Sequence, residues 1–210
     1  MANNDNIIIC VGRQLGSGGH AIGKLIAKHL GAAFYDKELL NLAAKESGFD
    51  EKFFEQNDEQ KGFFKSLFNI DMPSVQGLDF YHNTFSQQGL FEFQCDAIRR
   101  AASKGRCVFV GRCADYVLRD SKLMASVFVT ADIAERVQRV AQREGCTEEN
   151  ARKIISSQES ERASYYNYYT GKKWGACPSY DFSINSSLLG LEGTAAMIEM
   201  FLKERFGLER

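Results

Sequence analysis

The chain has 210 residues, of which 44% are hydrophobic, and its formal net charge at pH 7 is −1. This length suits one domain over 1–210, and the weak charge offers no broad field for nucleic acid or an anionic membrane, so neither is an expected partner. Any anion site must therefore be local. Residues 1–5 (MANND) contain no basic region and no long apolar stretch. We expect a cytoplasmic protein without a signal peptide or membrane span, with its six cysteines reduced.

Apolar runs of the buried-strand type alternate with segments of helical periodicity along the chain. Residues 6–11 form a continuous apolar run, typical of a strand buried on both faces of a parallel sheet. The Phe-rich stretch 49–80 is too irregular to assign. The alternation predicts an α/β fold with a mainly parallel sheet, which binds ligands beyond the carboxyl ends of its strands. In chain order we expect strand 6–11, helix 21–30, strand 33–35, helices 37–47 and 85–103, strands 107–110 and 126–130, helices 131–144 and 147–169, strand 181–185 and helix 192–206.

A glycine-rich turn, 12–20 (GRQLGSGGH), joins the first expected strand to the first expected helix. Glycines at such a turn let backbone N–H groups point at a phosphate, and the helix N-terminus adds partial positive charge. An ordinary tight turn is the alternative, but three glycines in four residues favour the anion site. His20 could donate to phosphate or simply start the helix in solvent. The predicted phosphate-binding residues are Gly16, Ser17, Gly18, Gly19 and His20.

The turn departs from the standard phosphate-binding pattern GxxxxGK[ST]. If Gly18 is the last glycine of the pattern, Gly19 stands at the position of the lysine. Lys24 lies further along the helix and is expected to point away. Arg13, or an arginine from a distant segment, is therefore the candidate for the missing cation, because arginine can bind phosphate through two hydrogen bonds.

Five segments carry a common family pattern: 12–30 (GRQLGSGGHAIGKLIAKHL), 34–38 (FYDKE), 108–112 (VFVGR), 161–175 (ERASYYNYYTGKKWG) and 180–191 (YDFSINSSLLGL). Together they resemble the cytidylate kinase-like family of P-loop kinases. The resemblance implies a three-layer α/β/α fold of the P-loop NTPase type around a five-stranded parallel sheet. Within that one domain it implies a helical acceptor-binding lobe at about 36–104 and a helical lid at about 132–175. It also implies transfer of the γ-phosphoryl group of ATP to CMP or a similar acceptor.

The resemblance assigns four residues to the acceptor side. Gly111-Arg112 resembles the Gly-Arg-Asp motif in which the arginine grips the acceptor phosphate, and a surface salt bridge is the alternative. Asp36 and Lys37 stand where the acceptor lobe begins, although Asp36 could instead cap a helix. Glu159 matches an acidic lid position of the family.

Lid arginines are the further catalytic candidates, besides Arg13. Arg162 matches a basic lid position of the family. Arg136, Arg139 and Arg143 recur at i, i+3 and i+7, so they share a helix face and could stabilise a transferring phosphoryl group. The alternative for these three is a solvated face offset by glutamates. Four nearby tyrosines either stack on a base or pack the interior: Tyr165, Tyr166, Tyr168 and Tyr169.

The chain departs from the family at Gly19, Ala21, Val110 and Cys113, which affect the phosphate clamp, the magnesium shell and base recognition. ATP is the expected cofactor, and Mg²⁺ is expected with it although its usual protein ligands are missing, so no residue is assigned to a metal. We expect ATP-dependent phosphorylation of a nucleoside monophosphate such as CMP or dCMP. The alternatives are a non-catalytic nucleotide-binding sensor and a kinase for another small phosphate acceptor. Nucleotides are the expected partners, and a homo-oligomer is left open.

Overall fold

The computed structural model describes residues 6–36 and 83–208. Strands and helices alternate through these residues as the sequence predicts. The elements are β1 (Ile8–Arg13), α1 (Gly19–His29), β2 (Ala33–Tyr35), α5 (Asn83–Ala102), β3 (Cys107–Val110), α6 (Ala114–Val117), β4 (Met124–Thr130), α7 (Ile133–Glu144), α8 (Glu148–Thr170), the 3-10 turn η3 (Cys177–Ser179), β5 (Phe182–Asn185) and α9 (Gly190–Phe206).

The described strands form one five-stranded sheet in the order β2-β3-β1-β4-β5, in which every neighbouring pair is parallel. The central strand β1 pairs with β3 and β4, so that Ile8 lies opposite both Cys107 and Met124. The predicted α/β fold with a mainly parallel sheet is confirmed. The carboxyl ends of the three central strands meet at one edge, where ligands of such sheets bind.

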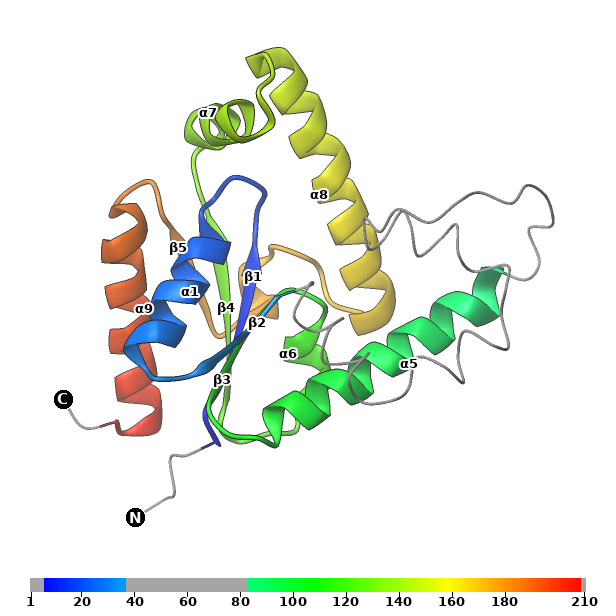
Figure 1. Ribbon diagram of the computed structural model, residues 1–210, viewed down its shortest axis with the longest axis vertical. Coiled ribbons are helices and arrows are strands. Elements are labelled where there is room, and N and C mark those ends of the chain that lie inside the picture. Colours follow the sequence, from blue (N-terminus) through cyan, green and yellow to red (C-terminus); the bar gives the residue numbers. More distant parts are fainter. Residues whose placement is uncertain (1–5, 37–82, 209–210) are drawn as a thin grey trace.

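Helices cover both faces of the sheet, with α1 and α9 on one side and α5 and α6 on the other (Figure 1). Successive residues of β1 therefore enter different cores. Ile9 and Val11 pack with α1 and α9, whereas Ile8 and Cys10 pack with α5 and α6. This two-sided burial explains why the strand reads as a continuous apolar run.

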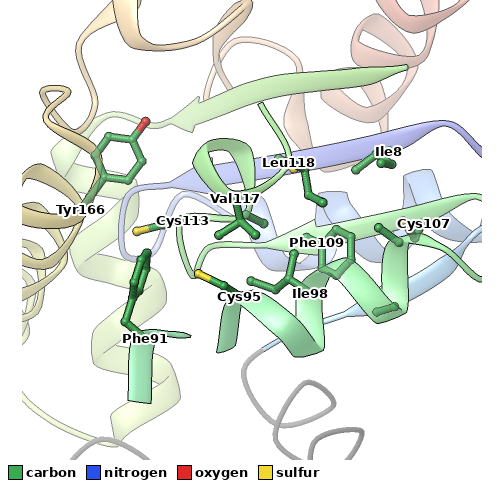
Figure 2. Close-up of a cluster of buried hydrophobic side chains, with 14 residues drawn as sticks. Ile8, Phe91, Cys95, Ile98, Cys107, Phe109, Cys113, Val117, Leu118 and Tyr166 are labelled. Carbon is green, nitrogen blue, oxygen red and sulfur yellow. The ribbon is translucent and has the colours of Figure 1, made fainter. Parts of the chain in front are cut away.

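The core beneath α5 and α6 includes aromatic and thiol side chains (Figure 2). Phe109 and Ile98 are fully buried there, and Cys95 and Cys113 lie beside Phe91. None of the six cysteines forms a disulfide. Helices α7 and α8 stand beyond the carboxyl ends of the strands (Figure 1) and pack on each other through a smaller apolar cluster, which includes Leu15 of the glycine-rich turn.

The first strand differs from its prediction because it runs to Arg13 instead of ending at Val11. Gly12 and Arg13 pair with Phe128 and Val129 of β4, so the ladder continues into the glycine-rich sequence. Arg13 is thus the last residue of β1 and not a member of the turn.

Other differences are small. The short elements α6 and η3 were not predicted, because three or four residues carry no periodicity. The expected helix 37–47, the Phe-rich stretch 49–80 and much of the acceptor lobe lie outside the described residues. Over 6–36 and 83–208, no helix combines the length and apolarity that a bilayer span requires.

Two residues of α9 test the core assignment. Leu202 is fully buried against the sheet, whereas Met200 in the same helix is 52% exposed. We expect Leu202→Ala to lower the free energy of unfolding by about 2–5 kcal/mol, because it removes buried methyl groups and leaves a cavity. Met200→Ala should change it by less than about 0.5 kcal/mol. Urea unfolding followed by circular dichroism measures both, and equal losses would contradict the packing of α9.

Candidate phosphate-binding site

The glycine-rich turn lies at the carboxyl end of β1, in close contact with α7 and α9. Gly16 and Gly18 both have a φ of +78°, a left-handed conformation that favours glycine. A Cβ on Gly16 would lie 2.7 Å from the backbone oxygen of Arg136, and a Cβ on Gly18 would collide with Leu191. A side chain at Gly16 would require the backbone of α7 to move, and one at Gly18 would displace the Leu191 side chain.

Every backbone carbonyl from residue 13 to residue 18 accepts a hydrogen bond, and most of the donors are side chains. The C=O and N–H of one peptide unit point in opposite directions. Because the carbonyls bond to groups around the outside of the turn, the N–H groups point toward its inner side. The donors are Arg162 Nη1 to Arg13 O (3.4 Å), Ser17 Oγ to Gln14 O (2.9 Å), Arg136 Nε to Leu15 O (2.9 Å), Arg139 Nη1 to Gly16 O (3.1 Å), Ser186 Oγ to Ser17 O (2.7 Å) and Ile22 N to Gly18 O (3.0 Å).

Several N–H groups of the turn remain open. The backbone N–H groups of Gly16, Gly18, His20 and Ala21 donate to no acceptor within the described residues. The last two begin α1, where the first N–H groups of a helix carry partial positive charge. The turn is therefore a surface of donors with its acceptors already occupied, which is the arrangement that binds a phosphate.

An ion pair between α7 and α8 is hydrogen-bonded to both the N–H and the C=O of Leu15. The Glu159 carboxylate accepts from Leu15 N–H at 3.0 Å and from Arg136 Nη2 at 2.6 Å, while Arg136 Nε donates to Leu15 O. The Arg136 side chain is only 6% exposed. Glu159, predicted on the acceptor side, thus contacts the glycine-rich turn, and we call this arrangement the Leu15 clasp.

The three arginines of α7 have different surroundings although they share a helix face. Arg136 is buried in the Leu15 clasp. Arg139 donates to Gly16 O and pairs with Glu135 at 2.6 Å. Arg143 is 54% exposed and pairs with Glu144 at 2.8 Å. The first two support the turn from outside, and the third resembles the solvated alternative, so direct contact of this trio with a phosphoryl group stays a prediction.

A second group of arginines converges at the other end of the turn. Arg13, Arg112 and Arg162 are half-buried and come from β1, the β3–α6 corner and α8. Burial, followed by the charges of Arg162 and Arg112, lowers the pKa of Arg13 to about 9, while Asp36 acts in the opposite direction. Burial also lowers the pKa of Arg112 and of Arg162. All three remain charged at neutral pH and form a local cationic site in a chain of net charge −1.

Arg112 sits in a strained corner after β3. Arg112 and Cys113 have φ values of 60° and 55°, which cost free energy in residues other than glycine. The Arg112 guanidinium is hydrogen-bonded to the Tyr165 hydroxyl, which donates to Gln94 Oε1 at 3.0 Å. Cys113, which stands at the aspartate position of the family motif, is buried in the core of Figure 2. The corner therefore leaves Arg112 partly exposed and places the next residue, Cys113, in the core.

The tyrosines of α8 pack mainly inside the molecule. Tyr166 is buried and donates to Asp115 Oδ2 at 2.7 Å, which ties α8 to α6. Tyr169 stacks on Phe91 with ring centroids 3.9 Å apart, whereas Tyr168 is 72% exposed. Packing, the commoner use of such a cluster, accounts for Tyr166 and Tyr169.

The remaining predicted residues that the structure describes, His20, Asp36 and Ser17, lie beside the start of α1. His20 Nε2 pairs with Asp36 Oδ2 at 2.9 Å, so its side chain is directed to a carboxylate. The backbone N–H of His20 remains available. Ser17 is fully buried, and its hydroxyl bonds Gln14 O inside the turn. Lys37 lies outside the described residues.

Two supporting residues were missed by the sequence reasoning. Ser186 follows β5 and could have been suspected, because every strand of a parallel sheet ends at the same edge. Gln94, which supports Tyr165, carries no signal in the sequence beyond its place in a long helix. Both act on groups far away in the chain, which spacing does not reveal.

The residues around the turn do not form a protein site for Mg²⁺. Ala21 has no hydroxyl, and the described part of the chain contains no cluster of three or more His, Cys, Asp or Glu side chains suited to a metal. Mg²⁺ can still enter with a nucleotide, because it commonly keeps several waters and binds phosphate oxygens.

Comparison with known proteins gives concordant matches. The model of the cytidylate kinase-like family matches residues 8–188. A cytidylate kinase from Pyrococcus horikoshii is 27% identical over 197 residues, which cover 93% of this chain and 88% of that protein. The crystal structure of an uncharacterized protein from Eubacterium ventriosum has a TM-score of 0.71 and 29% identity, covering 94% of this chain and 98% of that one. Shikimate kinase from Bacteroides thetaiotaomicron, with a TM-score of 0.52, 15% identity and the same coverage of both chains, shares the fold.

The Leu15 clasp can be tested by removing one partner. Arg136→Ala leaves Glu159, whose side chain is 19% exposed, without its counter-ion and leaves Leu15 O without a donor. We expect a loss of about 3–5 kcal/mol in the free energy of unfolding, as for other broken buried pairs. Arg143→Ala on the same helix, which breaks an exposed pair, should cost less than about 0.5 kcal/mol. Similar losses in chemical denaturation would refute the clasp.

Proposed function

Because this chain belongs to the cytidylate kinase-like family, we propose that it transfers the γ-phosphoryl group of ATP to a nucleoside monophosphate such as CMP or dCMP. Family membership supports the coarser activity, that of a nucleotide-binding phosphotransferase. The observation that carries the proposal is the polarity of the glycine-rich turn. Its carbonyls from 13 to 18 are occupied, its N–H groups at 16, 18, 20 and 21 donate to no described acceptor, and Arg13, Arg112 and Arg162 gather where β1 enters it.

In the proposed reaction the turn holds the phosphates of ATP and Arg112 holds the acceptor phosphate. An oxygen of the acceptor phosphate forms a bond to the γ-phosphorus while the bond from that phosphorus to the β–γ bridging oxygen breaks, giving ADP and a nucleoside diphosphate. Such a transfer needs positioning and charge stabilisation more than covalent help. The half-buried guanidinium groups supply the charge where bulk water is partly excluded, which strengthens it.

The lid helix α8 contributes to both sides of this reaction. Glu159 and Arg162 bond the backbone of the turn, and Tyr165 bonds Arg112. One helix thus fixes the distance between the donor-phosphate turn and the acceptor-phosphate arginine. We expect that fixed distance to matter, because a misplacement of about 1 Å can cost about 100-fold in rate.

A non-catalytic nucleotide-binding sensor is the second candidate, favoured by two observations. Ala21 offers no hydroxyl to a metal, and Cys113 is buried where the family motif has an aspartate. Both candidates require the turn to bind a nucleotide, and they differ only in whether phosphoryl transfer follows.

An acceptor screen separates these functions. The full chain is mixed with ATP, Mg²⁺ and one of CMP, dCMP, UMP, AMP or a set of non-nucleotide alcohols, and ADP formation is measured against ATP alone. We expect the fastest turnover with CMP or dCMP. Saturable ATP binding without transfer to any acceptor would support the sensor, and transfer to an alcohol alone would support a kinase for another acceptor. Neither binding nor transfer would refute the proposal.

Substitution of Arg112 should weaken binding of the acceptor monophosphate more than binding of ATP. We expect Arg112→Ala to raise the KM for the monophosphate about 10- to 100-fold, the effect of losing a charged hydrogen bond, while the KM for ATP changes little. Arg119→Ala, a control at the exposed end of the same corner, should leave both unchanged. An equal loss for the two substrates would count against the assignment of Arg112.

A further inference from the structure

The two departures from the standard phosphate-binding pattern at the ends of the turn are adjacent in space. In GxxxxGK[ST], the first glycine precedes the lysine by six positions. With Gly18 as the second glycine, the first-glycine position is Arg13 and the lysine position is Gly19. The chain thus has a cation where the pattern has a glycine, and a glycine where the pattern has a cation.

The structure shows that only one of these two positions can carry a side chain. A Cβ on Gly19 would lie 2.5 Å from Arg13 Cβ and 3.1 Å from Arg13 Cγ. Real Cβ atoms do not approach that closely, and the clash is with the stem of Arg13 next to the backbone. A lysine at 19 therefore excludes an arginine at 13, and the presence of Arg13 requires the glycine.

The Arg13 side chain passes Gly19 and extends toward Gly111, in the corner between β3 and α6. A Cβ on Gly111 would collide with Arg13 Nη1 and would lie 3.1 Å from Arg13 Cζ. The stem of Arg13 therefore lies against Gly19, in the first turn of α1, and its guanidinium lies against Gly111, next to Arg112 in the chain. The side chain thus extends from the turn to the arginine proposed for the acceptor.

Three of the four lid arginines already donate to the backbone of the turn, and the fourth, Arg143, pairs with Glu144. Arg136, Arg139 and Arg162 donate to the carbonyls of Leu15, Gly16 and Arg13. By contrast, the Arg13 guanidinium makes no hydrogen bond to another residue in the described ranges, 6–36 and 83–208. Among these residues its N–H donors are therefore not committed to a carbonyl, and burial with the charges of Arg162 and Arg112 lowers the pKa of Arg13 to about 9 despite the opposing charge of Asp36.

From these contacts we infer a reciprocal exchange: Arg13 has taken over the role of the phosphate-binding lysine, and Gly19 has taken over the role of the first glycine. This inference rests on the proposed function and specifies it, because it assigns Arg13 to the β- and γ-phosphates of the bound nucleoside triphosphate. Arginine suits this place, since its planar fork can bind two phosphate oxygens at once.

A double-mutant cycle, with the wild type, two single variants and the double variant, tests the exchange by isothermal titration calorimetry with ATP. Arg13→Gly should weaken ATP binding about 10- to 100-fold, because it removes a charged hydrogen-bond donor. Gly19→Lys alone should lower the melting temperature, since the new side chain meets Arg13. The double variant Arg13→Gly, Gly19→Lys rebuilds the standard pattern and should recover ATP affinity to within about tenfold of the wild type. A folded double variant that binds no better than Arg13→Gly would overturn the exchange.

Arg13→Gln keeps the inference testable if a glycine variant fails to fold. It preserves most of the side-chain length and removes the charge, so ATP affinity should fall about 10- to 100-fold. The ligand-free melting temperature should stay equal or rise, because one of three mutually repelling charges is gone. A merely structural residue would instead lower that temperature. Arg152→Gln, on the exposed side of α8, is the matched control and should change neither.

The outcomes separate this inference from the function on which it rests. If the wild type binds ATP and transfers phosphoryl groups, but Arg13→Gln binds ATP equally well, the exchange is wrong and the proposed function stands. If the wild type neither binds ATP nor transfers, both are wrong. Loss of ATP affinity in Arg13→Gln at unchanged melting temperature supports the exchange, whichever acceptor the enzyme uses.

Discussion

The Leu15 peptide is held on both sides by one ion pair, with Glu159 accepting from its N–H and Arg136 donating to its carbonyl. Removing two charges from water is costly, and here the two short backbone hydrogen bonds and the 2.6 Å contact between the partners offset that cost. Because the pair is neutral overall, it shapes the glycine-rich turn without cancelling the positive charge on the other side. The clasp fixes the Leu15 peptide and joins the turn to α7 and α8, while Arg162, Arg139 and Ser186 hold further carbonyls of the turn.

The three half-buried arginines form a local positive charge in a nearly neutral chain. The net charge of −1 gives no overall attraction, but three guanidinium groups from distant segments meet at the carboxyl edge of the sheet. Their mutual repulsion and partial burial disfavour the charged forms of these three groups. A negative charge placed beside them would offset the repulsion, so an arrangement that costs stability in the free protein would favour anion binding.

The β3–α6 corner shows how a departure from a family motif can be accommodated in the core. Cys113 replaces an aspartate and is buried with Phe91 and Cys95. A carboxylate is present two residues further on, where buried Asp115 accepts a hydrogen bond from Tyr166 and joins α6 to α8. Burial raises the pKa of Asp115, while its hydrogen bond from Tyr166 acts in the opposite direction. That carboxylate therefore holds α8 and the β3–α6 corner together.

The sequence by itself determined the order of the elements, the parallel sheet and the position of the glycine-rich turn at the carboxyl end of the first strand. Periodicity is a local property, and a glycine-rich turn between a buried strand and a helix has few geometric solutions. Only the tertiary structure decided which partner each charged side chain meets. By spacing alone, Arg136, Arg139 and Arg143 are equivalent. Because α7 extends away from the glycine-rich turn, the first is buried, the second is partly exposed and the third is exposed to solvent. Glu159 reaches a backbone group 144 residues away, and Arg13 excludes a side chain at Gly19, because folding brings their segments together at distances that no spacing in the chain encodes.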